Sequence, residues 1–231
     1  MKTQVIWYGH AALEIVTGGK RLLIDPFFSG NPVATAQPDT LAPDYILISH
    51  GHGDHVGDAV DIAKRTGAMI ISNFEICAWF QDKHGHANVH PQHIGGGFNY
   101  DFGRVKLTPA LHGSALPDGS NGGNPVGFLI TLSDGKKIYN AADTGLFGDM
   151  KLIGEEKIDL ALLPIGDNYT MGPDDALRAV KLIKPKVVIP IHYNTFDLIA
   201  QDAGKWARRV KTATQGKTKV AVLKPGESYA L

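Results

Sequence analysis

The feature that most constrains this chain is a histidine-rich segment, Ser49-His50-Gly51-His52-Gly53-Asp54-His55. It lies between a predicted strand and a predicted helix. Side chains alternate along an extended stretch, so His50 and His52 point to the same side. Asp54 and His55 then begin the helix, where the chain turns back toward the same point. Imidazole and carboxylate groups at this spacing are typical ligands for divalent cations. The alternative is a solvated polar loop.

Three further ligand-type residues favour the metal interpretation. His112, Asp143 and His192 each come just after a separate predicted strand. Taken alone, each of them is as compatible with an ordinary loop residue as with a ligand. Because strand ends meet at the edge of a sheet, we expect all three to converge on the histidine-rich segment.

Apolar and β-branched runs predict the strands of this chain. They are Gln4–Tyr8, Ala12–Thr17, Arg21–Ile24, Tyr45–Ser49, Met69–Ser72, Val105–Pro109, Val126–Leu132, Lys137–Asn140, Ile158–Pro164, Val187–Ile191 and Lys219–Leu223. Helices are predicted at Val56–Thr66, Phe74–Lys83, Pro173–Ile183 and Asp197–Ala213. The first three strands form an antiparallel meander, and Gly18-Gly19 is the hairpin turn between the second and the third.

The order of these elements, β-rich then helical, occurs twice. This predicts two similar halves, about 1–97 and 98–231, which we treat as a single domain over 1–231. We expect an α/β (α+β) protein in which two sheets pack together with helices outside.

Composition excludes several classes of protein. Lys and Arg number 23 and Asp and Glu number 23, so the chain lacks the basic excess of a nucleic-acid binder. Its apolar runs are far shorter than the roughly 20 residues that span a bilayer, and the first residues do not resemble a signal peptide. The single cysteine, Cys77, cannot form an internal disulfide and is expected in the core. We therefore expect a cytoplasmic protein without a nucleic-acid or membrane partner.

Taken together, the motifs resemble those of the metallo-β-lactamase-fold superfamily, whose pattern is H-x-H-x-D-H followed by His, Asp and His at strand ends. The resemblance covers the whole chain. It is strongest to the branch of small metal-dependent hydrolases that includes ascorbate-6-phosphate lactonase. The segments similar to that branch are Trp7-Tyr8-Gly9-His10-Ala11, Ile24-Asp25-Pro26, Gly166-Asp-Asn-Tyr-Thr-Met-Gly172 and Ile191-His-Tyr-Asn194.

The resemblance implies a four-layer αββα sandwich with a two-metal site at the sheet edge. It assigns one metal to His50, His52 and His112. It assigns the other to Asp54, His55 and His192, with Asp143 as the bridge. Zn²⁺ is the expected metal, and Mn²⁺, Ni²⁺ and Fe are alternatives that accept the same ligands.

Other residues carry less specific expectations. We expect His10 to be a neutral catalytic hydrogen-bond donor near the metals; the alternatives are a metal ligand and a buried structural histidine. Asp25 is either an acceptor that holds a ligand histidine or a turn residue. The loop residues expected to bind substrate are Phe27, Asn168, Thr170, Met171 and Asn194. The remaining histidines, His84, His86, His90 and His93, are expected in a solvated loop.

These expectations predict a hydrolase in which a metal-activated water cleaves a small-molecule ester, lactone or related bond. Asp54 is expected both to ligate a metal and to orient the nucleophile. A phosphodiesterase or nuclease is the alternative, although RNA-processing members of the superfamily carry an added arm or domain. A non-enzymatic metal-binding module is a third hypothesis. The expected partner is a small-molecule substrate, with a homo-oligomer as a possible assembly.

Overall fold

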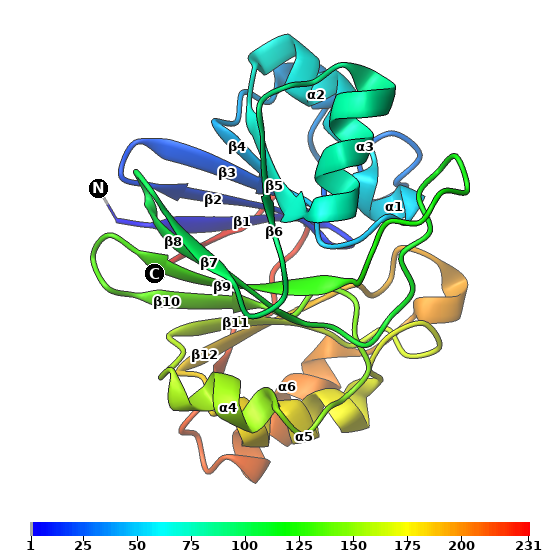
Figure 1. Ribbon diagram of the computed structural model, residues 1–231. Coiled ribbons are helices and arrows are strands. Elements are labelled where there is room, and N and C mark those ends of the chain that lie inside the picture. The colour runs from blue at the N-terminus through cyan, green and yellow to red at the C-terminus, as the bar shows by residue number, and fades with distance from the viewer. Residues whose placement is uncertain (1) are drawn as a thin grey trace.

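Two sheets packed face to face form the centre of the computed structural model, which describes residues 2–231 (Figure 1). The first sheet contains β14 (Ser228–Ala230), β1 (Gln4–Gly9), β2 (Ala12–Thr17), β3 (Lys20–Ile24), β4 (Tyr45–Leu47), β5 (Met69–Asn73) and β6 (Val89–Gln92), in that spatial order. The second contains β13 (Lys219–Val220), β12 (Val187–Ile191), β11 (Leu160–Pro164), β10 (Lys137–Asn140), β9 (Val126–Leu132), β8 (Gly103–Pro109) and β7 (Gly97–Tyr100).

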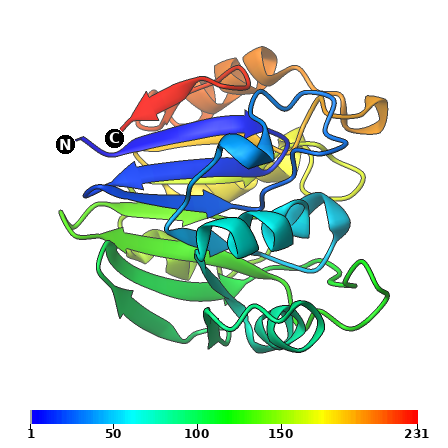
Figure 2. The same ribbon diagram turned by 90° about the horizontal axis from the view of Figure 1, so that it is seen from above.

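Helices cover the outer face of each sheet, as the view from above also shows (Figure 2). The first sheet carries α1 (Gly53–Val56), α2 (Ala59–Thr66) and α3 (Phe74–His84). The second carries α4 (Met150–Glu155), α5 (Pro173–Ile183) and α6 (Ala203–Ala213). The expected four-layer αββα architecture is therefore confirmed. No helix among residues 2–231 is both long and apolar enough to cross a membrane.

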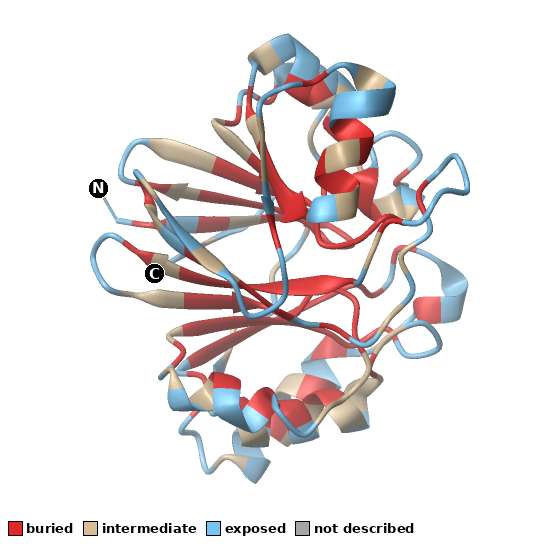
Figure 3. Cartoon of the chain, viewed as in Figure 1, coloured by how far each residue is buried: buried red, intermediate tan, exposed pale blue. Residues whose placement is uncertain are grey.

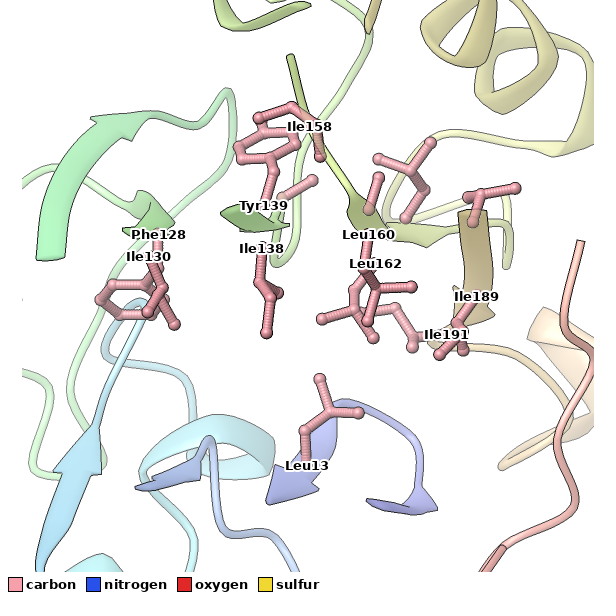
Figure 4. Close-up of a cluster of buried hydrophobic side chains, with 14 of the residues drawn as sticks. Leu13, Phe128, Ile130, Ile138, Tyr139, Ile158, Leu160, Leu162, Ile189 and Ile191 are labelled. Atoms are coloured by element: carbon pink, nitrogen blue, oxygen red, sulfur yellow. The ribbon is translucent and has the colours of Figure 1, made fainter. Parts of the chain in front are cut away.

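The core lies between the two sheets, where alternate side chains of each strand meet. In Figure 4, Leu13 from the first sheet points toward Ile138 and Leu162 of the second, while Tyr139 points to the opposite side of its strand. The strands β11 and β12 are buried along their full length, as expected of strands that are covered on both faces. Figure 3 shows that exposure is concentrated on the outer helices and the loops.

Strand direction determines where the chemistry gathers. In the first sheet β1 and β3 both run antiparallel to β2, and β3, β4 and β5 are parallel. In the second sheet β8 runs in the direction of β10, which is parallel to β11 and β12. The carboxyl ends of the strands that run in the common direction therefore emerge at one edge, on the right of Figure 1. These strands include β1, β3, β4, β5, β8, β10, β11 and β12.

Several element boundaries differ from the sequence prediction. The helix expected over Val56–Thr66 is divided at Gly57, whose φ of 44° interrupts the α-helical conformation. The helix expected over Asp197–Ala213 is a 3₁₀ turn, η2 (Asp197–Ile199), followed by α6, whose first turn is capped by the Asp202 side chain.

Five short elements were not predicted, because each offers too few residues for a periodic pattern: the 3₁₀ turn η1 (Pro38–Thr40), α4, β6, β7 and β14. β14 also changes the division into halves. It comes from the end of the chain but pairs with β1 of the first sheet.

Candidate metal centre

Turns at the strand ends bring the predicted site residues together. His10 follows β1, Asp25 follows β3 and His192 follows β12, and their φ angles are 53°, 46° and 54°. Ala142, directly before Asp143, has a φ of 53°. Positive φ is unfavourable for residues with a Cβ, and such strain is characteristic of functional sites. The chain thus bends sharply at four strand ends beside one cluster.

The centre of this cluster is one carboxylate oxygen of Asp143. Its Oδ2 atom lies 3.0 Å from His192 Nε2, 3.3 Å from His55 Nε2 and 3.6 Å from His112 Nε2. These histidines come from both sheets. The resemblance expects Asp143 to bridge two metals, and an oxygen that faces three imidazoles is compatible with that expectation.

Two groups of donor atoms flank Asp143. His50, His52 and His112 form one group, in which the ligand atoms lie within 4.8 Å of one another. His50 Nε2 is 3.1 Å from His52 Nδ1. Gly113 lies against the imidazole of His52, where a Cβ would approach Nε2 to 3.3 Å. The composition of this group matches the first predicted metal site.

The second group contains Asp54, His55 and His192, as predicted, and also His10, with the same limit of 4.8 Å between ligand atoms. His10 is buried, and its Nε2 atom lies 3.0 Å from Asp54 Oδ2. Its Nδ1 atom is 2.8 Å from Thr195 Oγ1. Because both ring nitrogens have protein partners, this geometry favours a role for His10 in positioning Asp54 over direct donation to a substrate.

The buried carboxylate of Asp25 forms hydrogen bonds with the histidine-rich segment on the side away from Asp143. Asp25 Oδ2 accepts hydrogen bonds from Ser49 Oγ at 2.6 Å and from His55 Nδ1 at 2.9 Å, and Asp25 Oδ1 accepts from Ser49 N at 2.8 Å. With its Nδ1 proton held by Asp25, His55 presents Nε2 to the site. Such partners orient ligand imidazoles and raise their basicity. Asp25 is therefore more than a turn residue.

The donor set fits a metal centre. Among residues 2–231, buried polar atoms without a hydrogen-bond partner include Nε2 of His55, Nε2 of His192 and Oδ1 of Asp143. Burying such atoms unpaired costs free energy, and all three belong to residues of the cluster. Imidazole and carboxylate donors suit Zn²⁺ and its first-row neighbours.

The pKa values of the cluster histidines are shifted in opposite directions. Burial lowers the pKa of His50 well below its usual value, lowers the pKa of His112, and lowers the pKa of His10 to about 4. These rings are therefore neutral, the form in which imidazole ligates a metal. For His55 the effect of burial is outweighed by Asp143 and Asp25, which raise its pKa well above the usual value.

The residues expected to bind substrate divide into two kinds. Met171 is buried in the core, so that expectation was wrong: its side chain is not available to a substrate. Phe27 is half-buried, and its ring centroid lies 5.6 Å from that of His10. Asn168, Thr170 and Asn194 lie on loops at the same edge and are at least partly exposed.

The four remaining histidines lie in segments other than those of the cluster, but they do not share a solvated loop. His84 ends α3 and His90 lies in β6. His86 is buried and its Nε2 atom bonds the Ala68 carbonyl at 2.9 Å. His93 is exposed. The sequence shows the density of histidine here but does not show that β6 brings the segment onto the first sheet.

Comparison with known proteins agrees with this geometry. Residues 20–193 match the family model of the beta-lactamase superfamily domain. This chain belongs to that family. A UPF0173 metal-dependent hydrolase of Pelotomaculum thermopropionicum is 50% identical over 233 residues, covering 99% of this chain and 100% of the relative. A Thermus thermophilus protein with the same family name is 48% identical, covering 99% of each chain.

Solved structures show the same β-lactamase superfamily fold. Igni18, a metallo hydrolase from the archaeon Ignicoccus hospitalis, superposes with a TM-score of 0.91 at 37% identity, covering 100% of this chain and 99% of its own. An isothiocyanate hydrolase from Delia radicum gut bacteria has a TM-score of 0.75 at 23% identity, covering 99% and 98%. The protein is a metal-dependent hydrolase of the metallo-β-lactamase superfamily.

Sequence reasoning gave no role to Ser49 or Phe196, which contact residues of this site. Ser49, the first residue of the histidine-rich segment, donates a hydrogen bond to Asp25, and the ring centroid of Phe196 lies 5.9 Å from that of His10. Ser49 directly precedes the first histidine, and Phe196 is an aromatic residue shortly after a ligand-bearing strand. Those positions were the available signals, but neither spacing shows the contact.

Proposed function

We propose that this protein hydrolyses a small-molecule ester, lactone or related bond at a centre that would hold two divalent cations, with Zn²⁺ as the expected metal. The observation that carries the proposal is the position of Asp143 Oδ2, which faces Nε2 atoms of His55, His112 and His192. His50, His52 and His112 would hold one cation. Asp54, His55 and His192 would hold the other.

Cations in such a donor set supply a water nucleophile at neutral pH, since they lower its pKa to about 7, and they polarise the oxygen of the bond under attack. The protein supplies orientation and proton handling. Asp54 is the more exposed of the two proposed carboxylate ligands, with 36% of its side chain accessible compared with 3% for Asp143. It can therefore reach an incoming water. His10 holds the Asp54 carboxylate through Oδ2 and so limits its rotation.

The test combines metal content with turnover. Protein purified with metal in excess is expected to bind about two equivalents and to cleave members of a panel of esters and lactones. A folded protein that binds no metal would overturn the proposal. A protein that binds two metals but cleaves nothing in the panel would favour the metal-binding module instead.

Chelation provides an independent measurement. A ligand that binds only the folded state stabilises it by about 2.7 kcal/mol at a concentration one hundred times its dissociation constant. For a chain of this size, metal removal should lower the melting temperature by roughly 5–10 °C. The temperature should recover when metal is restored. We also propose a cytoplasmic location, which the single reduced cysteine supports.

A further inference from the structure

The loops around the proposed metal centre carry large apolar residues that are exposed. Leu111, Tyr169, Phe196 and Leu198 are large hydrophobic residues with 56%, 57%, 45% and 59% of their surface accessible. Together with the half-buried Phe27 we call them the apolar rim. They come from four loops that extend to the same edge as the strand ends, on the right of Figures 1 and 3.

Contacts tie these loops to the cluster. Phe27 and Phe196 both approach the ring of His10 edge-on, with centroid distances of 5.6 and 5.9 Å. Leu111 directly precedes His112, and its amide bonds Thr144 Oγ1 at 2.9 Å.

The loop that carries Tyr169 is held at the same point. The amide of Met171 donates to the Thr144 carbonyl at 2.9 Å. Thr144 in turn follows Asp143. The loops of Leu111 and Tyr169 are thus held by a residue next to a proposed ligand, and the side chains of Phe27 and Phe196 contact the cluster itself.

One basic side chain, Lys224, lines a cavity with Val33 and Asn194 on this side of the molecule, but the loops that bear the cluster and the apolar rim have no basic residue other than histidine. The segments 26–37, 49–58, 110–125, 141–149, 165–173 and 192–204 bear or flank the cluster and contain neither Lys nor Arg. They do contain acidic residues, including Asp167, Asp197 and Asp202. A phosphate or carboxylate remote from the scissile bond is normally recognised by a basic side chain, most effectively by Arg. These loops offer such a group no partner and several like charges.

We infer that the substrate is uncharged away from its scissile bond and carries an apolar group that packs on the apolar rim. The inference rests on the proposed function and narrows it. It predicts that a neutral ester or lactone with an alkyl or aryl group is a better substrate than a phosphorylated sugar lactone. It also predicts that such an ester or lactone is a better substrate than a nucleic acid, whose phosphates need cationic contacts. Ligand sites are lined mostly by apolar and aromatic side chains with a few polar groups, and Phe27 and Phe196 beside His10 fit that description.

Three matched probes test the inference on metal-loaded protein: p-nitrophenyl acetate, p-nitrophenyl hexanoate and mono-p-nitrophenyl adipate. The last is the hexanoate ester with a terminal carboxylate. Burial of about two of the four added methylenes would raise kcat/KM about tenfold from acetate to hexanoate. The adipate ester should fall below the hexanoate ester by about tenfold or more, because its carboxylate must be desolvated without a partner.

Variants locate the effect. Phe196→Ala and Leu198→Ala should reduce the ratio of kcat/KM for hexanoate to kcat/KM for acetate by roughly three- to tenfold, whatever their effect on the absolute rates. The matched controls are Phe98→Ala and Leu152→Ala, whose side chains are 47% and 59% exposed but lie on β7 and α4. These controls should leave the preference unchanged. Leu198→Lys should shift the preference from hexanoate toward adipate.

The outcomes separate this inference from the proposed function. Turnover of esters without a preference for hexanoate, or with equal effects of rim and control variants, overturns the inference and leaves the proposed function intact. If no ester is cleaved, the proposed function fails, and calorimetric binding of hexanoate and acetate to the metal-loaded protein decides the inference. Tighter binding of hexanoate that Phe196→Ala abolishes then supports it, and equal binding of the two acids overturns it.

Discussion

His10 Nε2 lies 3.0 Å from Asp54 Oδ2, and this contact connects the end of the first strand to the histidine-rich segment. On the other side of the ring, Nδ1 lies 2.8 Å from Thr195 Oγ1. Thr195 follows β12 and the proposed ligand His192. A single buried imidazole thus spans loops from both sheets. Its neutral form, with the proton on Nε2, satisfies both contacts at once.

Removing the Thr195 hydroxyl should loosen this arrangement. Thr195→Val keeps the side-chain shape but deprives His10 Nδ1 of its donor. Because such supporting contacts affect metal affinity by about 10- to 100-fold, the affinity of the second site should fall within that range. Isothermal calorimetry with Zn²⁺ measures it, and Thr195→Ser should restore most of the loss. Equal affinities for the Val variant and the native protein would contradict the role of Thr195.

Metal content distinguishes the two possible roles of His10. If His10 positions Asp54, His10→Ala should fold, retain about two equivalents of metal at saturating concentration, and hydrolyse esters about 10- to 100-fold more slowly. Elemental analysis of the purified variant tests this. Loss of one equivalent would instead make His10 a ligand, which its place in the second donor group also permits.

His52 and His93 offer a matched comparison between a histidine inside the cluster and one outside it. His52→Ala should lose a metal equivalent and nearly all hydrolysis, since it removes one of three donors from the first group. His93→Ala should retain both, because His93 is exposed and lies in a segment that contributes nothing to the two donor groups or to Asp143. His86 would be a poor control, since its buried ring bonds the Ala68 carbonyl. Similar behaviour of the two variants would refute the proposed ligand set.

Asp25→Asn tests the support behind His55. The amide keeps the shape of the side chain but loses its charge, and its NH₂ group cannot accept the hydrogen bonds that Asp25 receives from Ser49 and His55. We expect metal affinity to fall by about 10- to 100-fold with the fold retained. Calorimetric metal titration measures the affinity, and circular dichroism checks that the fold is retained. A native affinity in this variant would return Asp25 to the role of a turn residue.

Cys77 should be inert in the folded protein. It lies in α3 with 1% of its surface accessible, and burial raises its thiol pKa to about 12. Since the thiolate is the reactive form, iodoacetamide at pH 8 should alkylate folded protein about a thousandfold more slowly than denatured protein. Mass spectrometry follows the single modification. Rapid alkylation of protein that remains folded would show that the helix opens.

The same shift predicts how stability depends on pH. In the unfolded chain the thiol ionises at about pH 8.5, and in the folded chain it stays protonated to a higher pH. The contribution of Cys77 to stability is therefore complete below about pH 8.5 and declines as the pH rises toward the folded pKa. Cys77→Ala should weaken this alkaline loss of stability in denaturant titrations. An identical pH dependence in the variant would contradict the assignment.

Local pattern was sufficient for most strands and for the histidine-rich segment. The predicted strand over Val126–Leu132 and the helix over Pro173–Ile183 have the observed bounds, because alternation, Pro at the first turn and buried periodicity are local properties. Local pattern was insufficient where elements are short. β14 has three residues, and its existence depends on the edge that β1 offers it.

The sequence by itself determined the inventory of ligand-type residues and their places at strand ends, since these follow from residue identity and from short-range periodicity. Only the tertiary structure decided their partners. Met171 has the sequence context of a loop residue, yet it is buried, while Phe196 emerges beside His10. His10 meets Thr195 across 185 positions of sequence separation. Contacts of that kind depend on how two sheets pack and on which face each turn presents, and no local pattern encodes either.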